Sequence, residues 1–379
     1  MSVRPRRGIG FRLAARAGWD SVSGGSLPTH MAKLNQQVIA DRLGISRATV
    51  SRCFTNHPGI NPATRAKVFQ VAAELGYKHL EMRSPGARKT FPSKIGVLIC
   101  VDEQEYKHNP FQNPAERILE GITEYAHLHD SGLDVHLVSP QGLSVADPTY
   151  PPVAEMRRNW NGILLVYPFP DPVIQELATI LPVVSLVEQF DHAGIDCVDV
   201  DHYKGISSVI DHLVEHGHER IGFFTRRYPV EASWSYRRYA AFMEKMARSH
   251  LRVRHKDIIS VFPSPETTSK ESIRTALERT QDGVTAWVCA ADQQAYELVR
   301  ALRRAGFRVP AEVSVTGFDG ITAPKDCPAL TTVEIPFREI GVIGVQRLND
   351  RIRRRYGSAQ HVLINCRLRP GATVAPPPS

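Results

Sequence analysis

The chain has 379 residues, 42% of them hydrophobic and 23% charged, which is typical of a globular protein with two or three domains. No apolar run approaches the roughly 20 residues that a membrane-spanning helix needs, so the sequence predicts no membrane partner. The net charge of +8 is uneven, because residues 1–30 carry +4, residues 31–89 carry +7 and the remainder carries −3. A basic N-terminal part on a mildly acidic body indicates a nucleic-acid-binding module attached to something else.

Residues 1–30 are predicted to form a disordered basic extension. Their arginines resemble the n-region of a signal peptide, but the run FRLAARAG is no apolar h-region. A second methionine, Met31, stands shortly before the first expected helix, so a start site assigned too early is an alternative. A basic arm that adds non-specific DNA affinity is another.

Residues 35–76 predict three short helices from the signals that start and stop helices. Gly44 ends the first helix, where a left-handed backbone is often needed. Ser46 caps the second helix, which spans about 47–54. The pair 61–62, Asn-Pro, starts the third helix, since proline is tolerated in a first turn. Only a few residues separate the first two helices, which is the helix-turn-helix plan.

The second helix is predicted to read DNA. Val50 faces inward, and the small Ala40 lets the first two helices approach closely. In this motif the second helix lies in the major groove, where Arg52 can bind a guanine through two hydrogen bonds. Thr64 and Arg65 begin the third helix and suit phosphate. The predicted DNA-binding residues are Ser46, Arg47, Ala48, Thr49, Ser51, Arg52, Asn61, Thr64 and Arg65. The alternative is a three-helix bundle that only packs.

The runs VIADRLGISRATVSR and INPATRAKVFQVAAELGY resemble the DNA-binding headpiece of the LacI/GalR family of bacterial transcriptional regulators. We therefore expect an all-α helix-turn-helix headpiece over residues 31–77, followed by a hinge or linker over residues 78–93. The family resemblance implies a hinge helix there, with a leucine that enters the minor groove. This chain departs from that pattern, because Pro85 and Gly86 mark a turn where the helix would be. Leu80 or Met82 in a shifted register, or a plain linker, are the open alternatives.

From Lys94 onward, short apolar runs alternate with helical stretches, which predicts parallel doubly wound sheets. The runs VDHYKGISSVIDHLVEHGHERIGFF, CAADQQAYELVRALRRAGFRVPAEVSVTGFDGI and LTTVEIPFREIGVIGVQRL resemble the effector domain of the same family. That resemblance implies an α/β fold with two periplasmic-binding-protein-like lobes over residues 94–373, and a tail over 374–379.

The same resemblance implies that the chain crosses between the lobes three times. The predicted crossings lie near residues 189–201, 318–322 and 335–337. Lobe 1 is then expected to comprise about 94–190 and 319–336, and lobe 2 about 200–318 and 337–373. Ligands of such folds bind between the lobes, at the carboxyl ends of the strands.

Two charged residues are predicted to contact such a ligand. Asp292 ends the apolar run AWVCAA at a strand-to-helix turn, so we expect it to point into the crevice and accept hydrogen bonds from ligand hydroxyls. Capping the following helix is the alternative, and both roles can hold. The resemblance implies an arginine at Arg238, although Ala241 replaces the glycine that follows it in the family. Arg237 is the alternative.

Two aromatic residues complete the predicted effector site. Phe111, in HNPFQNP, resembles the aromatic residue of an Asn-Pro-Phe run at the mouth of the family's first lobe. Trp234 can stack on a ligand in the same way. For both, simple packing is the alternative.

The sequence shows no catalytic constellation. The six cysteines are scattered without zinc spacing, and no phosphate-binding glycine loop or nucleophile elbow is present. We therefore predict no enzyme activity, no cofactor and no metal. Free cysteines suit a reducing compartment, and a bacterial, nucleoid-associated cytoplasmic protein is expected.

These observations predict a sequence-specific transcriptional regulator, a repressor by resemblance, that binds a palindromic double-stranded operator as a homodimer or higher oligomer. A small effector between the lobes would control its operator affinity, and the resemblance alone implies a sugar or sugar derivative. The alternatives are a solute-binding protein without a regulatory role and a regulator that answers to no ligand.

Overall fold

The protein is described by a computed structural model that covers residues 35–77, 93–101, 114–151, 153, 158–190, 194–228, 230, 232–259, 261, 268–353 and 357–378. The chain divides into two units, Met1–Leu34 and Asn35–Ser379. The expected extension at 1–30 and nearly all of the expected linker at 78–93 lie outside the described residues. Within the described part of the chain, no helix combines the length and the apolarity of a membrane span.

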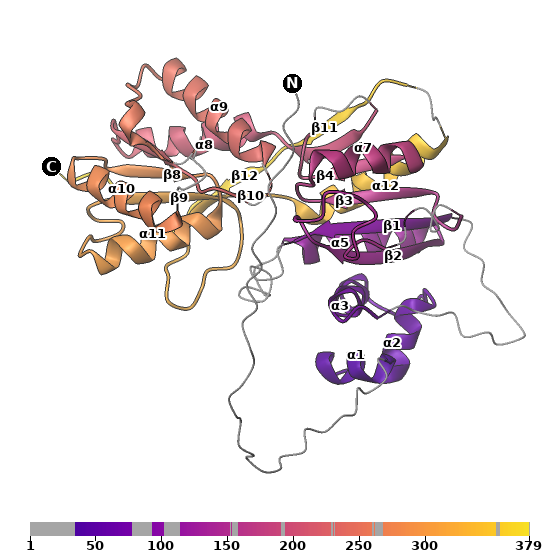
Figure 1. Cartoon of the computed structure of the whole chain (residues 1–379). Helices are drawn as coiled ribbons and strands as arrows, with labels where there is room; N and C mark the ends of the chain where they lie inside the picture. The colour runs from indigo at the N-terminus through magenta and orange to yellow at the C-terminus, as the bar shows by residue number, and fades with distance from the viewer. Residues whose placement is uncertain are drawn as a thin grey trace, which may run out of the picture. The chain divides into compact units, whose positions relative to one another are not determined.

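The headpiece consists of three helices, α1 (Gln36–Leu43), α2 (Arg47–Phe54) and α3 (Pro62–Glu74), drawn in indigo in Figure 1. Gly44 ends α1 in the left-handed conformation, with φ 64°, as the sequence predicts. Ser46 caps α2 and Asn61 caps α3, each through a side-chain oxygen that accepts a backbone N–H. Because Gly44 ends α1 and Ser46 caps α2 only two residues later, the two helices form a helix-turn-helix.

The headpiece has its own apolar core, and the core fixes which face of α2 is left outside. Ile39 and Ala40 from α1, Val50 and Cys53 from α2, and Val68 from α3 are almost completely buried together. Because Val50 and Cys53 lie on one side of a two-turn helix, the polar residues between them point away from the bundle.

Lobe 1 is built on a six-stranded sheet in the order β11-β5-β4-β3-β1-β2, and every neighbouring pair is parallel. Its strands are β1 (Ser93–Cys100), β2 (Ser131–Val138), β3 (Gly162–Val166), β4 (Val183–Leu186), β5 (Asp196–Val200) and β11 (His361–Ile364). Its helices are α5 (Ala115–Leu128), α7 (Asp171–Ile180) and α12 (Phe337–Arg353).

Alternation along β1 explains how lobe 1 is layered. Ile95, Val97 and Ile99 belong to the cluster that contains α5 and α12, whereas Leu98 packs with α7 on the opposite face. Both faces of the sheet are therefore covered, which accounts for the continuous apolar run of this strand.

Lobe 2 is built on a second six-stranded sheet, in the order β12-β10-β9-β8-β6-β7. Its strands are β6 (Ile221–Phe224), β7 (Ile258–Ile259), β8 (Ala286–Cys289), β9 (Ser314–Asp319), β10 (Thr331–Glu334) and β12 (Arg367–Arg369). Helices α8 (His202–Glu215) and α9 (Ser233–Arg248) cover one face, and α10 (Ser269–Gln281) and α11 (Asp292–Arg304) cover the other (Figure 1). Only β12 runs antiparallel to its neighbour. The predicted pair of doubly wound parallel sheets is confirmed.

The crossings between the lobes differ in part from the predicted ones. The chain passes from β5 to α8 at Asp201, within the predicted range 189–201, and from β10 to α12 near 335–337, also as predicted. The predicted crossing at 318–322 is wrong, because β9 and β10 are parallel neighbours in the same sheet. The remaining crossing lies between β11 and β12, at residues 365–366.

The predicted lobe boundaries after residue 318 are therefore exchanged. Residues 331–334 belong to lobe 2, whereas 337–353 and 361–364 belong to lobe 1. Two glycines explain why α12 packs in lobe 1: a Cβ on Gly341 would collide with the Ile118 carbonyl of α5, and one on Gly121 of α5 with the Arg338 carbonyl of α12. Only glycine allows this close helix approach.

Thr373 and Ala375 pack on lobe 2. The Thr373 hydroxyl is buried, donates to the Val315 carbonyl at 2.6 Å and accepts from the Thr331 N–H at 3.0 Å. Ala375 follows, and its carbonyl oxygen lies 2.9 Å from Nε2 of the buried His218. These bonds tie the start of the predicted tail to β9 and β10.

Candidate DNA-binding surface and inter-lobe site

The outer face of α2 presents most of the predicted DNA-reading residues to solvent. Arg47, Ala48 and Arg52 are exposed, and Thr49 and Ser51 are half-buried. Ser46 is exposed as well, but its hydroxyl accepts the Thr49 N–H at 3.1 Å and therefore holds the start of the helix. The backbone of this surface is thus fixed by a cap, and its long side chains are free to meet a groove.

The three residues at the start of α3 that were predicted to bind DNA lie in different environments. Asn61 uses its side chain to cap the helix, accepting the Ala63 N–H at 2.8 Å. Thr64 is half-buried. Arg65, predicted to contact phosphate, is buried instead: its guanidinium binds the Asn56 side chain and the His57 carbonyl oxygen. Burial lowers the pKa of Arg65, and in this arrangement the side chain fixes the α2–α3 loop.

Three of the four residues predicted to bind an effector lie within the described part of the chain. Phe111 lies outside it. Trp234 is half-buried at the start of α9, and Arg238, one helical turn later, is buried. Asp292 begins α11 on the other side of the lobe 2 sheet and is fully buried.

Arg238 is held by aromatic rings and an acid. Its guanidinium carbon lies 3.8 Å from the ring centroid of Phe318 and 4.6 Å from that of Trp234. Its Nη1 donates to the Ala290 carbonyl at 2.5 Å and lies 3.3 Å from Asp319 Oδ1. Cation–π contacts and a buried ion pair together fix this arginine at the carboxyl ends of the lobe 2 strands. Arg237, the alternative arginine for ligand binding, immediately precedes Arg238 on α9 and is half-buried.

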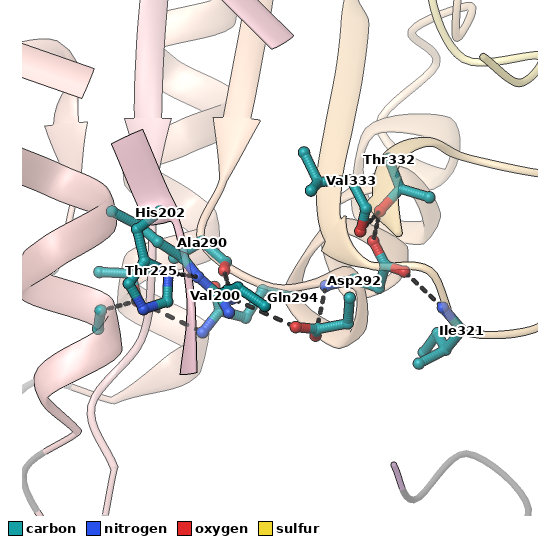
Figure 2. Close-up of polar contacts among 12 residues, drawn as sticks. Val200, His202, Thr225, Ala290, Asp292, Gln294, Ile321, Thr332 and Val333 are labelled. Atoms are coloured by element: carbon teal, nitrogen blue, oxygen red, sulfur yellow. Dashed lines mark hydrogen bonds and ion pairs between the residues drawn. The ribbon is translucent and has the colours of Figure 1, made fainter. Parts of the chain in front are cut away.

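Asp292, which the sequence predicts to point into the crevice between the lobes, instead bonds to neighbours within lobe 2. One carboxylate oxygen accepts from the Thr332 hydroxyl at 2.5 Å and the other from the Ile321 N–H at 2.8 Å (Figure 2). It is no helix cap either, since α11 has Ala291 at its N-cap position and no side-chain cap bond. The side chain instead fastens α11 to β10 and to the segment after β9.

Asp292, which is fully buried, and Asp319, which is partly buried, form a pair of neighbouring acids. The Asp319 carboxylate accepts the backbone N–H of Asp292 at 3.3 Å. Burial raises the pKa of both carboxyls, and the charge of Asp319 raises that of Asp292 further. The ion pair with Arg238 opposes the shift at Asp319. Like charges so close in a low dielectric favour one shared proton.

Two residues that the sequence did not single out extend this network across the first crossing. Asp199, on β5, accepts from Gln189 Nε2 at 2.8 Å and lies 2.9 Å from Nε2 of His202, the first residue of α8. His202 Nδ1 lies 3.3 Å from Arg238 Nε. Burial raises the pKa of Asp199, but the charge and hydrogen bond of His202 outweigh it and the net pKa is lowered.

A second set of polar and aromatic side chains adjoins Trp234. The Tyr228 ring lies edge-on to Trp234 at 5.0 Å, and the guanidinium of Arg226 lies 5.3 Å from the Tyr228 centroid. Gln294 donates to the Tyr228 hydroxyl and is fully buried. Aromatic faces beside polar groups of this kind can bind a sugar ring or a planar base.

In the described residues, no group of three or more His, Cys, Asp or Glu side chains is placed to hold a metal ion. A capped helix-turn-helix and two parallel α/β lobes, joined in one chain with a polar network where the lobes meet, define a DNA-binding regulator of the two-lobed class.

Comparison with known proteins bears out this class. Residues 37–79 match the family described as bacterial regulatory proteins, lacI family, and residues 210–374 match the periplasmic binding protein-like domain. The chain belongs to the LacI family. It is 27% identical to the HTH-type transcriptional repressor CytR of Escherichia coli K12, over 87% of this chain and 93% of that protein. It is 25% identical to the repressor MelR of Bacillus subtilis, over 86% and 93%.

Solved structures share the fold. A transcriptional regulator CelR–cellobiose complex superimposes with a TM-score of 0.63 at 21% identity, covering 90% of this chain and all of that one. The lac repressor dimer bound to operator and an anti-inducer gives 0.58 at 21% identity, covering 90% and 99%. The relatives are transcriptional repressors, so this protein is a regulator of transcription that binds DNA and not an enzyme.

Proposed function

We propose that this protein is a repressor that binds a palindromic operator in double-stranded DNA as a homodimer or a higher oligomer, in the bacterial cytoplasm. The observation that carries the proposal is the exposed face of α2, with Arg47 and Arg52 presented on a capped helix. One such helix reads only a few base pairs, so two headpieces on half-sites about one DNA turn apart are needed for specificity. The headpiece is assigned to residues 31–77, the linker to 78–93 and the two lobes to 94–373.

The ligand is proposed to be a sugar or sugar derivative bound between the lobes. Trp234 offers a half-buried ring, and Arg238 offers a fixed guanidinium beside it. Structures of the same fold carry cellobiose and glucose. Phe111 and Asp292 complete the proposed site. Asp292 would act on the ligand through the segment after β9, or directly once its bonds to Thr332 and Ile321 are exchanged.

Control of operator binding is proposed to be a coupling free energy between the two sites. A ligand that binds one lobe arrangement better than another shifts the population toward it. The lobes carry the headpieces through the linker, so a changed arrangement changes the headpiece spacing. A regulator that answers to no ligand remains the second candidate, because Arg238, Asp292 and Asp319 are already bonded to one another.

The first experiment is a selection of genomic fragments with purified full-length protein at two salt concentrations. A recovered palindrome that survives the higher salt supports the proposal. Salt-sensitive binding without sequence preference contradicts the assignment of α2 as a base-reading helix.

The ligand site is tested with Asp292→Ala, once an operator and a sugar that changes operator affinity have been found. The variant should bind operator normally but lose the response to the sugar, because the bonds to Thr332 and Ile321 are removed. Asp326→Asn, which alters a surface ion pair with Arg300, is the matched control. A normal response in Asp292→Ala would remove this residue from the site.

A further inference from the structure

Glu188 is an acid of lobe 1 that lies buried against lobe 2. It follows β4 in the connection to β5, and the preceding residue, Val187, has φ 60°. A β-branched residue adopts this conformation only when the surrounding structure imposes it. The Glu188 carbonyl accepts from the Ser185 hydroxyl and from the Cys197 thiol, so β4 and β5 both hold its backbone.

The side chain of Glu188 bridges the lobes. Its Oε1 accepts the backbone N–H of Ser233, the first residue of α9, at 2.9 Å. The N–H of the next residue, Gln189, donates to the Ser233 hydroxyl at 3.4 Å. Helix α9 has Ala232 at its N-cap and no side-chain cap of its own. Lobe 1 therefore supplies the acceptor for a free N–H at the start of a lobe 2 helix.

The second carboxyl oxygen is not satisfied. Among the residues that the structure describes, neither Glu188 Oε2 nor Arg237 Nε has a hydrogen-bond partner, although both atoms are buried. Arg237 of α9 attracts a negative charge on Glu188, and Asp199 of β5 repels it. The Cys197 thiol of β5 is the other titratable group that faces it, and it carries no charge to compensate.

The charge state of Glu188 should therefore matter for the lobe contact. Burial raises its pKa to about 8; the Ser233 hydrogen bonds oppose this shift and the Asp199 charge adds to it. A neutral carboxyl can keep the Ser233 bond at little cost in a dry site. An ionised carboxylate places charge on a buried Oε2 that has no hydrogen-bond donor among the described residues, and the attraction of Arg237 offsets only part of this cost. Water can reach Oε2 if α9 moves away from β4.

We propose that Glu188 is a proton-controlled latch between the lobes: the neutral carboxyl holds the arrangement described above, and ionisation releases it. The inference needs only the two-lobed fold and not the identity of any effector. In the arrangement in which Glu188 reaches water, its carboxyl would have an ordinary pKa. The lobe equilibrium would then shift by about tenfold per pH unit up to about pH 8, which is about a hundredfold between pH 6 and pH 9.

The test uses full-length protein without ligand, between pH 6 and 9. Trp234 adjoins Ser233, so its fluorescence, taken as the difference between the unchanged protein and Trp234→Phe, reports on the contact. We expect a change in fluorescence that develops below pH 8 and levels off near it, and none in Glu188→Gln, which keeps the acceptor for Ser233 but cannot ionise. The exposed Glu215→Gln is the matched control and should behave as the unchanged protein. A transition that persists in Glu188→Gln overturns the proposal.

Small-angle X-ray scattering on the same samples separates a latch from a local change. The radius of gyration of the unchanged protein should change through the same pH range, while that of Glu188→Gln should stay constant. A fluorescence transition without a change in the radius of gyration would show that Glu188 titrates but does not control the arrangement of the lobes. Arg237→Gln should raise the pH at which the change levels off, since it removes a cation that favours the ionised form.

Discussion

The two binding regions of this protein hold their polar side chains in opposite ways. On the headpiece, Arg47 and Arg52 face solvent from a helix whose backbone is fixed by Ser46 and by an apolar core. In the predicted effector site, Arg238 and Asp292 are buried, and each is already bonded to protein partners. The first surface is ready for its target, whereas the second must exchange internal bonds before anything else can use its polar groups.

This difference suits the two tasks. A surface that reads base edges gains specificity from rigidity, since ordering a loose side chain on binding costs affinity. A site that changes the lobe arrangement needs bonds that one state has and another lacks. The inter-lobe network contains such bonds, because Asp199 of lobe 1 contacts His202 of lobe 2, and Glu188 contacts Ser233.

The largest effect is expected from Arg238→Ala, which breaks the inter-lobe network. It leaves the partly buried Asp319 beside Asp292 without its cation, and breaking a pair in this way costs up to about 3–5 kcal/mol of unfolding free energy. Urea denaturation measures it. Arg248→Ala, at an exposed ion pair with Glu244 further along α9, should cost under about 1 kcal/mol. Equal losses in the two variants would mean that the network contributes no special stability.

Arg52→Ala tests the opposite case, a side chain that matters for binding and little for folding. It should weaken operator binding by about 1–3 kcal/mol and relax specificity at one position per half-site, with stability nearly unchanged. Binding to a set of single-base operator variants measures this. Arg42→Ala, which removes an exposed α1 arginine paired with Glu74, should leave the preference intact. An unaltered preference in Arg52→Ala would exclude this residue from base reading.

The headpiece could be predicted from sequence because its determinants are local. Gly44, Ser46 and Asn61 act within four residues of their own positions, and all three end or start helices as the sequence predicts. Arg65 is the exception. A charged residue at a helix start suggests a phosphate contact, and only the folded loop shows that Asn56 and the His57 carbonyl oxygen take up its guanidinium.

The lobes could be predicted as a class but not in their connections. Alternating strands and helices give parallel sheets, yet nothing local shows that β10 returns to the lobe 2 sheet beside β9. The glycines at 341 and 344 were the feature of the sequence that could have indicated that α12 packs closely against a neighbouring element, here α5 and β4 of lobe 1. In the inter-lobe site, Asp199, His202 and Asp319 meet Arg238 only through the fold, so sequence spacing could not bring them together.

Ser46→Ala tests whether the Ser46 cap keeps the DNA-reading face of α2 ordered. Loss of the Thr49 bond should cost about 1 kcal/mol of headpiece stability. Operator affinity should fall by a similar amount, because α2 must then be ordered on binding. Thermal unfolding and operator titration measure the two effects. Ser46→Thr keeps a capping hydroxyl and should restore most of both. Loss of affinity without loss of stability would instead indicate that Ser46 contacts DNA directly.

Deleting residues 1–30 should have the smallest effect and asks whether the headpiece reads DNA without help. The segment carries +4, so it can add affinity for any phosphate backbone, but this contribution is independent of sequence and weakens with salt. We expect the shortened protein to keep its operator preference, and to lose at most a part of its affinity that disappears at higher salt. Titrations against operator and scrambled DNA at two salt concentrations measure both. A lost preference at high salt would show that α2 and α3 alone do not suffice to read the operator.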